Sequence, residues 1–213
     1  MPPQRAMTAT QRVSEAAEAL REEKFAARRI ELAEAALETL GELGFARTSL
    51  REIAQNSAFT HGVFHYYFSD KLDLICCCVR HYKAQCVTRY DEVTAAAKTR
   101  DELMEGFLGK LAATLREDAR MHRLWYDLRA QALFESAFRA DVVEIDRNLE
   151  AMIWRIASRF GELGGKKPAI SSAALYALFD GLFQSALLKH FSNDAAAIPD
   201  LLAEVRRLLP MIC

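Results

Sequence analysis

The chain has 213 residues, of which 51% are hydrophobic, and its 28 lysine and arginine residues nearly balance 29 aspartate and glutamate residues. This composition is that of an ordinary globular protein and excludes the disordered, collagen-like and disulfide-stapled classes. A formal net charge of -1 argues against indiscriminate, charge-driven coating of nucleic acid, although it says nothing about a local basic patch.

Helix-forming residues dominate the whole chain. It has only 9 glycines and 5 prolines and is rich in alanine, leucine, glutamate and arginine, so we predict an all-α fold of about nine helices. The first predicted helix covers residues 24–43, where apolar side chains recur every 3.6 residues and Gly41 and Gly44 end the pattern. Residues 1–23 are expected to be a flexible or partly helical N-terminal extension.

Two short helices joined by a tight turn follow. The first begins after Ser49, which forms a capping box with Glu52 three residues later and predicts a helix that ends near residues 56–57. Thr60 is the predicted N-cap of the second short helix, which extends to about residue 68. A supporting helix followed by two short helices is typical of a helix-turn-helix, so we predict a DNA-binding domain over residues 24–70.

The second short helix has polar groups of the kind that contact base edges in the major groove. We expect Thr60, His61, Gly62, His65 and Tyr66 on its exposed side, with Gly62 allowing the backbone to approach DNA closely. The spacing of four between the histidines also occurs in metal-binding helices. Because no third ligand shares their face, we expect no metal site and no cofactor.

Two segments of this region share a pattern with known regulators. They are Gly44-Phe45-Ala46-Arg47-Thr48-Ser49-Leu50-Arg51-Glu52-Ile53-Ala54 and Thr60-His61-Gly62-Val63-Phe64-His65-Tyr66-Tyr67-Phe68-Ser69-Asp70-Lys71. The pattern resembles the signature of the tetracycline-repressor (TetR) family. The resemblance implies that Thr48, beside Ser49, lies at a DNA phosphate, that Thr60 to Tyr66 enter the major groove, and that Tyr67 and Lys71 contact the flanking backbone.

Two positions depart from the usual family pattern. Ala58 stands in the turn where the family usually has glycine, and His65 stands where a tyrosine is frequent. An alanine held at positive φ would cost about 1 kcal/mol.

Longer helices are predicted for the rest of the chain, at about 70–97, 100–117, 119–136, 139–163, 168–191 and 196–209. We expect residues 71–213 to form a ligand-binding and dimerisation domain. The helix at 168–191 is apolar on almost every side and carries small residues four apart, and the last helix has a regular apolar face. Both are expected to pair with a second copy in a four-helix interface, as in the resembled family. The predicted interface residues are Leu175, Ala177, Leu178, Gly181, Leu182, Ser185, Leu201, Leu202, Val205, Leu208 and Leu209.

Aromatic and methionine side chains in this domain have two interpretations. They are either core residues or the walls of a partly apolar cavity for a small molecule, and the resemblance favours the cavity for the set as a whole. The residues are Tyr82, Met121, Trp125, Tyr126, Phe134, Met152, Trp154 and Phe183. The helix that starts near Asp70 is the expected connection between this cavity and the DNA-binding domain.

Charge is distributed unevenly along the chain. Residues 44–90 contain six basic and three acidic groups, a local charge of +3, and the remainder sums to -4. A modest positive face on a nearly neutral protein favours selective, salt-sensitive binding of DNA.

Other classes of function have little support in the sequence. It contains no phosphate-binding glycine loop, HExxH or GxSxG motif, so we expect no catalytic residues. Five cysteines without CxxC spacing predict reduced thiols, and Cys76, Cys77 and Cys78 leave a thiol sensor as an alternative. Without a membrane span or a secretory signal, we expect a cytoplasmic protein bound to DNA.

Together these features predict a ligand-responsive transcriptional regulator, with repression as the expected outcome. It would bind a near-palindromic double-stranded DNA operator as a homodimer and be released by a small, partly apolar effector. A second possibility is a helical DNA-binding dimer that responds to no small molecule.

Overall fold

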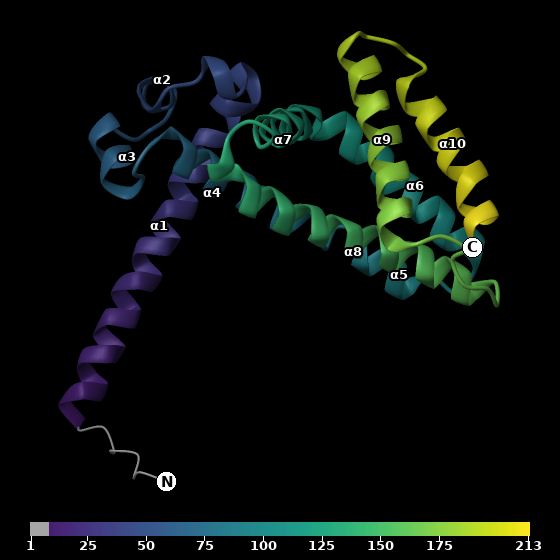
Figure 1. The fold of residues 1–213 in the computed structure, drawn as a ribbon, viewed down its shortest axis with the longest axis horizontal. Coiled ribbons are helices and arrows are strands. Elements are labelled where there is room, and N and C mark those ends of the chain that lie inside the picture. The colour runs from purple at the N-terminus through teal and green to yellow at the C-terminus, as the bar shows by residue number, and fades with distance from the viewer. Residues whose placement is uncertain (1–8) are drawn as a thin grey trace.

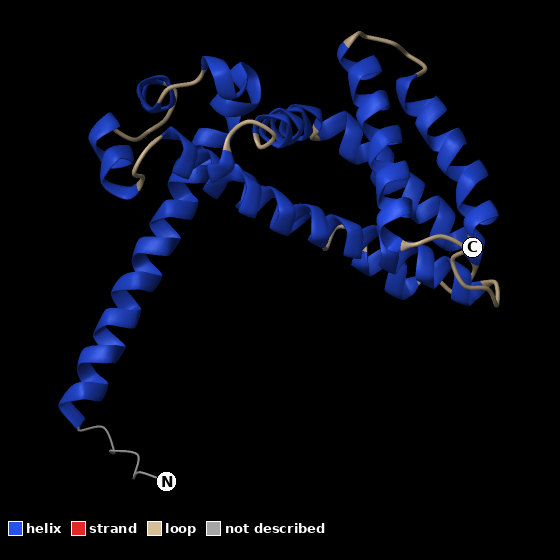
Figure 2. Cartoon of the chain, viewed as in Figure 1, coloured by secondary structure: helices blue, strands red, loops and turns tan. Residues whose placement is uncertain are grey.

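A computed structural model describes residues 9–213, with side chains described from residue 15 onward. All regular structure in this range is helical (Figure 2) and comprises ten α-helices and one short 3-10 helix. The all-α prediction is therefore confirmed. Residues 1–8, which belong to the N-terminal extension predicted to be flexible or partly helical, lie outside the described part of the chain.

The first helix is longer than predicted and ends at an interrupted turn. Helix α1 (Ala9–Arg47) begins well before residue 24, because alanine, glutamate and arginine favour helix throughout this stretch and no glycine or proline lies between Ala9 and Gly41. Gly44 has a φ of 75° and interrupts the helical geometry, as its position in the sequence predicted. The N-terminal part of α1 is exposed and projects away from the rest of the molecule (Figure 1).

Two short helices follow, α2 (Leu50–Gln55) and α3 (His61–Tyr67). Together with the second half of α1 they form residues 24–70, which we call the head. The predicted capping box is present: the Ser49 amide donates to Glu52 Oε2 at 2.8 Å, and the Glu52 amide donates to Ser49 Oγ at 3.2 Å. Within the described residues the only non-glycine residue at positive φ is Asn193. Ala58 thus has an ordinary φ, and the strain considered for it does not arise.

Removal of this cap gives a first test of the head. Replacing Ser49 by alanine is expected to lower the free energy of unfolding by about 1 kcal/mol, because the Glu52 amide loses its acceptor. A denaturant titration followed by circular dichroism measures the loss. Ser136→Ala is the matched control, since this exposed serine has no side-chain hydrogen bond within the described residues. An equal change in both variants would contradict the assignment.

The remaining helices form a body that packs directly on the head. They are α4 (Lys71–Cys86), α5 (Asp91–Ala96), α6 (Arg100–Glu117), α7 (Ala119–Gln131), the 3-10 helix η1 (Ser136–Phe138), α8 (Arg139–Leu163), α9 (Ser172–Phe191) and α10 (Ala197–Ile212). Helix α1 packs on α4 and α7, and α10 packs on α9 and α6. In Figure 1, α9 and α10 lie side by side at the end of the molecule opposite α2 and α3.

One predicted helix is divided in the structure. The expected helix at 70–97 becomes α4 and α5, separated by a turn over residues 87–90. Arg155 from α8 stabilises this break, because its guanidinium donates to the Val87 carbonyl at 2.6 Å and pairs with Asp91 at 2.8 Å. In a continuous helix the Val87 carbonyl would accept a hydrogen bond from a backbone amide, but here it accepts one from Arg155. Because Arg155 is distant in the sequence, local sequence alone could not show the break.

Candidate nucleic-acid interface and internal cavity

Helix α3 presents a continuous polar surface to solvent. Thr60, His61, Gly62, His65 and Tyr66 are all exposed on it, as predicted, and Tyr66 reaches 73% exposure. Thr60 is the N-cap residue, but its hydroxyl makes no capping hydrogen bond and so remains available to a phosphate or a base. No atom lies within 4 Å of the position that a side chain on Gly62 would occupy.

The two histidines of α3 contact each other. Their Nε2 atoms are 3.0 Å apart and their rings meet edge to face. Within the described residues no group of three histidine, cysteine or acidic side chains is placed to hold a metal ion. The pair therefore forms part of the exposed polar surface of α3, where imidazole nitrogens can donate to or accept from base edges.

The opposite side of α3 is anchored in the protein core. Phe64 and Phe68 are buried, and Arg29 of α1 donates to the Tyr67 carbonyl at 2.7 Å while its guanidinium lies 4.4 Å from the Phe68 ring. Arg29 also pairs with Asp73 of α4. Partial burial opposes ionisation of Asp73, yet the hydrogen bonds from Arg29 lower its pKa. These contacts fix the orientation of α3 relative to α1 and α4.

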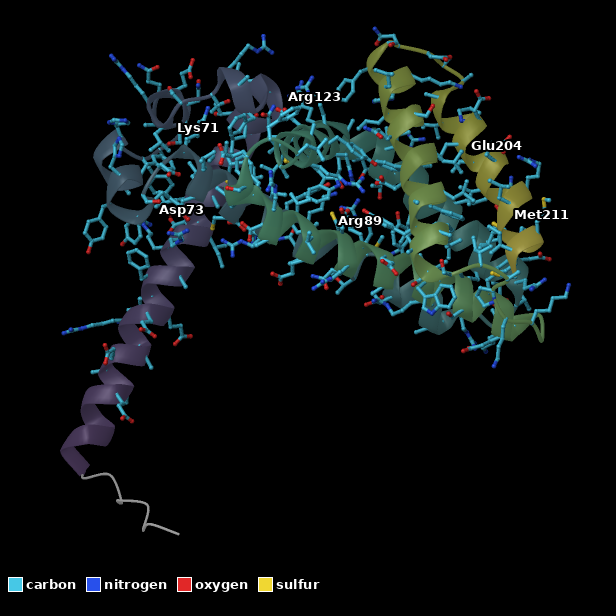
Figure 3. All side chains as sticks on the ribbon, viewed as in Figure 1. Lys71, Asp73, Arg89, Arg123, Glu204 and Met211 are labelled. Carbon is cyan, nitrogen blue, oxygen red and sulfur yellow. The ribbon has the colours of Figure 1, made fainter. Side chains whose placement is uncertain are left out.

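The other predicted DNA contacts lie beside α3, and several support the head. Thr48 is buried, and its hydroxyl donates to the Gly44 carbonyl at 2.7 Å. Tyr67 is half-buried and packs on Phe25. The Lys71 ammonium donates to the Phe45 carbonyl at 3.0 Å, at the base of the head in Figure 3. Ser49 is exposed and caps α2.

The local charge of residues 44–90 divides between two regions. Arg47 and Arg51 are exposed on the head, with Lys71 at its base. Lys83 and Arg89, by contrast, line a cavity in the body. The positive charge available to DNA is therefore smaller than the sum over the segment suggested.

A cavity of about 80 Å³, partly open to solvent, lies between α4, α6, α7, α8, α9 and α10. Most of its wall is apolar and aromatic, and the side chains include Phe107, Leu111, Trp125, Leu149, Met152, Phe179, Phe183, Leu201 and Val205.

One side of the cavity holds a buried basic group. Lys83 is only 3% exposed, and its Nζ lies 3.3 Å from His122 Nδ1 and 5.1 Å from the centre of the Trp125 ring. Burial lowers the pKa of Lys83 to about 8. Burial, together with the charges of Lys83 and Arg89, also lowers the pKa of His122 far enough to keep its imidazole neutral.

The acidic groups near the cavity already have partners. Arg129 pairs with Asp180 at 2.5 Å and with Asp146 at 3.2 Å. Tyr126 donates its hydroxyl to Asp180 at 2.9 Å, and Tyr176 donates to Asp146 at 2.6 Å. Arg89, labelled in Figure 3, pairs with Asp118 at 2.6 Å.

The cavity includes some of the predicted pocket residues and leaves others out. Trp125, Tyr126, Met152 and Phe183 line it. Tyr82 and Trp154 pack around the core without lining the cavity, and Met121 contacts Gly41 at the head. Phe134 is 87% exposed because α7 ends at Gln131 and leaves it in the following turn. Lys83 and His122 also line the cavity and were not predicted from the sequence.

Helix α7 contacts the cavity and the head through different residues. His122, Trp125 and Tyr126 line the cavity, whereas Arg123 donates to the Glu42 carbonyl at 3.1 Å and Asp127 accepts from the Phe45 amide at 2.8 Å. Figure 3 shows Arg123 where α7 meets the end of α1. Helix α4 also spans both regions, with Lys71 against the head and Lys83 in the cavity.

The predicted interface residues fall into three groups. Leu175, Leu201, Val205 and Leu209 are buried within the chain, because α9 and α10 pack on each other and on α8 and α6. The outer face keeps the small residues Ala177, Gly181 and Ser185 exposed, with Leu178 beside them. Leu182, Leu202 and Leu208 are half-buried.

The thiols in the described residues lie mainly in the core. Cys76, Cys78, Cys86 and Cys213 are buried, and Cys77 is half-buried. Burial raises the pKa of Cys76 to about 12 and raises those of Cys77 and Cys78. The reactive thiolate is thus disfavoured at all three consecutive positions.

Comparison with known proteins finds a family model that matches most of the head. Residues 32–75 match the family model described as bacterial regulatory proteins, tetR family. A comparison of the sequence with curated proteins finds no match. In the described part of the chain, no helix has both the length and the hydropathy needed to span a membrane.

Solved structures share the fold over most of the chain. A TetR transcription regulator from Haloarcula marismortui superposes with a TM-score of 0.70 at 16% identity, covering 87% of this chain and 98% of that one. The transcriptional regulator FadR from Bacillus subtilis, in complex with stearoyl-CoA, has a TM-score of 0.66 at 18% identity and coverages of 84% and 95%. Reduced NemR from E. coli has a TM-score of 0.67 at 17% identity and coverages of 84% and 96%.

Proposed function

We propose that this chain, whose residues 32–75 match the TetR family model and whose fold is shared with a TetR transcription regulator, is a transcriptional repressor released from DNA by a small, partly apolar effector. In this proposal residues 24–70 bind double-stranded DNA, residues 71–213 bind the effector and form the dimer, and the protein acts in the cytoplasm.

The observation that carries the proposal is the placement of α4 and α7. Each helix lines the cavity with some residues and holds the head with others, namely Lys71 on α4 and Arg123 and Asp127 on α7. A ligand that changes the packing of these helices would also change the position of α3. It would release DNA to the extent that it binds the DNA-incompatible arrangement more tightly.

Further features support the separate parts of this proposal. The exposed polar face of α3 suits the major groove, and the small residues on the outer face of α9 suit close packing with a second copy. A dimer would place two α3 helices about 34 to 36 Å apart, one turn of DNA, and so would favour a near-palindromic operator. The FadR complex with stearoyl-CoA is a structure of similar fold that holds a ligand with a long apolar chain.

The alternatives receive less support. A dimer without an effector would be expected to fill its body with side chains, whereas this body contains a cavity with a buried polar wall. A thiol sensor requires an accessible thiolate, and burial disfavours ionisation at Cys76, Cys77 and Cys78.

The experiment that tests the proposal is selection of bound DNA from a random duplex pool, repeated with a small-molecule extract of cells. We expect enrichment of a near-palindrome and loss of binding when the extract is added. Enrichment of no sequence would contradict operator binding. Enrichment unaffected by any extract fraction would favour the regulator without an effector.

Substitutions on α3 test base readout. His61→Ala and His65→Ala are each expected to weaken operator binding by about 1–3 kcal/mol without lowering stability, because both side chains are exposed. Fluorescence anisotropy with selected and scrambled duplexes measures the change in affinity and in specificity. His190→Ala on α9 is the matched control. Unchanged specificity in both α3 variants would show that these histidines do not read bases.

A further inference from the structure

Lys83 is a buried cation without an anionic partner. Its side chain is 3% exposed, and the ion pairs among the described residues do not include it. The nearest polar contact of its ammonium is His122 Nδ1 at 3.3 Å, a neutral imidazole nitrogen. Buried ammonium groups are normally paired with a carboxylate, because desolvation without compensation is costly.

Two further hydrogen-bond donors line the cavity beside Lys83. An ammonium group only donates, so His122 Nδ1 accepts and the imidazole proton lies on Nε2. That Nε2 atom is buried and has no hydrogen-bond partner within the described residues, and the same is true of the Trp125 indole nitrogen. Lys83, His122 and Trp125 thus bring three nitrogen donors together, and the donors of His122 and Trp125 have no acceptor.

The protein's own carboxylates do not fill this role. Asp180 and Asp146 share Arg129, and each also accepts a tyrosine hydroxyl. Asp118 is engaged by Arg89. The acids near the cavity are therefore satisfied by other groups, and an acceptor on a bound ligand would complete the hydrogen bonding of these donors.

We propose that the ligand of this cavity is an apolar carboxylic acid whose carboxylate binds the Lys83 ammonium and accepts hydrogen bonds from His122 and Trp125. Its apolar part would lie against the aromatic wall that includes Phe107, Phe179 and Phe183. This inference rests on the proposed effector role of the cavity and specifies the chemical class of the effector.

Paired ligands test the inference on the intact dimer. Isothermal titration calorimetry compares 4-phenylbutanoate and decanoate with the corresponding primary amides and amines, which have similar shapes but no negative charge. At least one acid is expected to bind roughly ten- to a hundredfold more tightly than its amide, because charge-assisted hydrogen bonds are stronger than neutral ones. The amine is expected to bind more weakly than the amide.

Variants identify the group responsible. In Lys83→Met, which keeps an unbranched side chain of similar length, the preference for acid over amide is expected to fall to about one, as the charge-assisted bond is lost. Lys98→Met replaces an exposed lysine and is expected to keep the preference of the parent protein. If Lys83→Met does not fold, the comparison of acids and amides in the parent protein decides the question.

The outcomes separate this inference from the proposed function. Amides or amines that bind as tightly as acids and release DNA would overturn the carboxylate assignment. They would still support the proposal that a ligand releases the protein from DNA. A preference for acids that persists in Lys83→Met would likewise overturn the role of Lys83. Absence of binding by every acid, amide and amine would overturn the inference. If the protein also kept its DNA affinity in the small-molecule extract of cells, the effector role of the cavity would be overturned as well.

Discussion

Leucine in place of Gly181 is expected to prevent the proposed dimer from forming and to weaken operator binding roughly 10²- to 10⁴-fold, the advantage that two linked binding sites provide. Gly181 lies on the exposed face of α9 between Ala177 and Ser185, and no atom of the chain lies within 4 Å of the position of an added Cβ. The new side chain therefore fits the monomer and obstructs only a second helix. Sedimentation velocity and anisotropy with operator DNA measure the two effects.

Gly109 of α6 provides the matched control. It is also an exposed helical glycine with no atom within 4 Å of an added Cβ, but it lies outside the proposed interface. Gly109→Leu is expected to remain dimeric and to bind DNA as the parent protein does. A Gly181→Leu protein that stays dimeric would place the interface elsewhere.

Alanine in place of Phe64 is expected to abolish DNA binding by unfolding the head. Phe64 is fully buried beneath α3, and removal of a buried phenylalanine costs about 3–5 kcal/mol. Such a loss is a large fraction of the stability of a small domain. The cavity and the proposed interface lie in the body, so dimerisation and ligand binding are expected to survive. Circular dichroism, sedimentation and calorimetry on the same sample distinguish these effects.

The neighbouring Tyr66 supplies the control for this substitution. It is 73% exposed, so Tyr66→Ala is expected to weaken DNA binding while leaving the melting temperature nearly unchanged. Retention of full operator affinity in Phe64→Ala would contradict the assignment of α3 as the recognition helix. Loss of dimerisation in that variant would contradict the proposed division into head and body.

The head could be predicted from sequence because its determinants are local. The capping box joins Ser49 and Glu52, three residues apart, and Gly44 interrupts α1 through its own backbone conformation. The end of α4 is different, because the break after Cys86 is stabilised by Arg155, 68 residues beyond Val87 along the chain. Contacts between distant segments leave no periodic pattern in the sequence.

The cavity was only partly predictable for a related reason. A search for aromatic and apolar residues finds Trp125 and Phe183 but passes over Lys83, since lysine is normally exposed. A signal was nevertheless present: Lys83 lies four residues after Val79 and eight after Ile75, both buried on α4. A lone lysine on the apolar face of a helix therefore indicated an unusual buried charge.

The central claim is that occupancy of the cavity changes DNA affinity through α4 and α7. Its most direct test is the affinity of the intact protein for its selected operator, measured by anisotropy with and without a saturating concentration of a ligand shown by calorimetry to bind. We expect the ligand to weaken DNA binding about 5- to 150-fold, and DNA to weaken ligand binding by the same factor. Equal DNA affinity in the free and ligand-saturated protein would contradict the account.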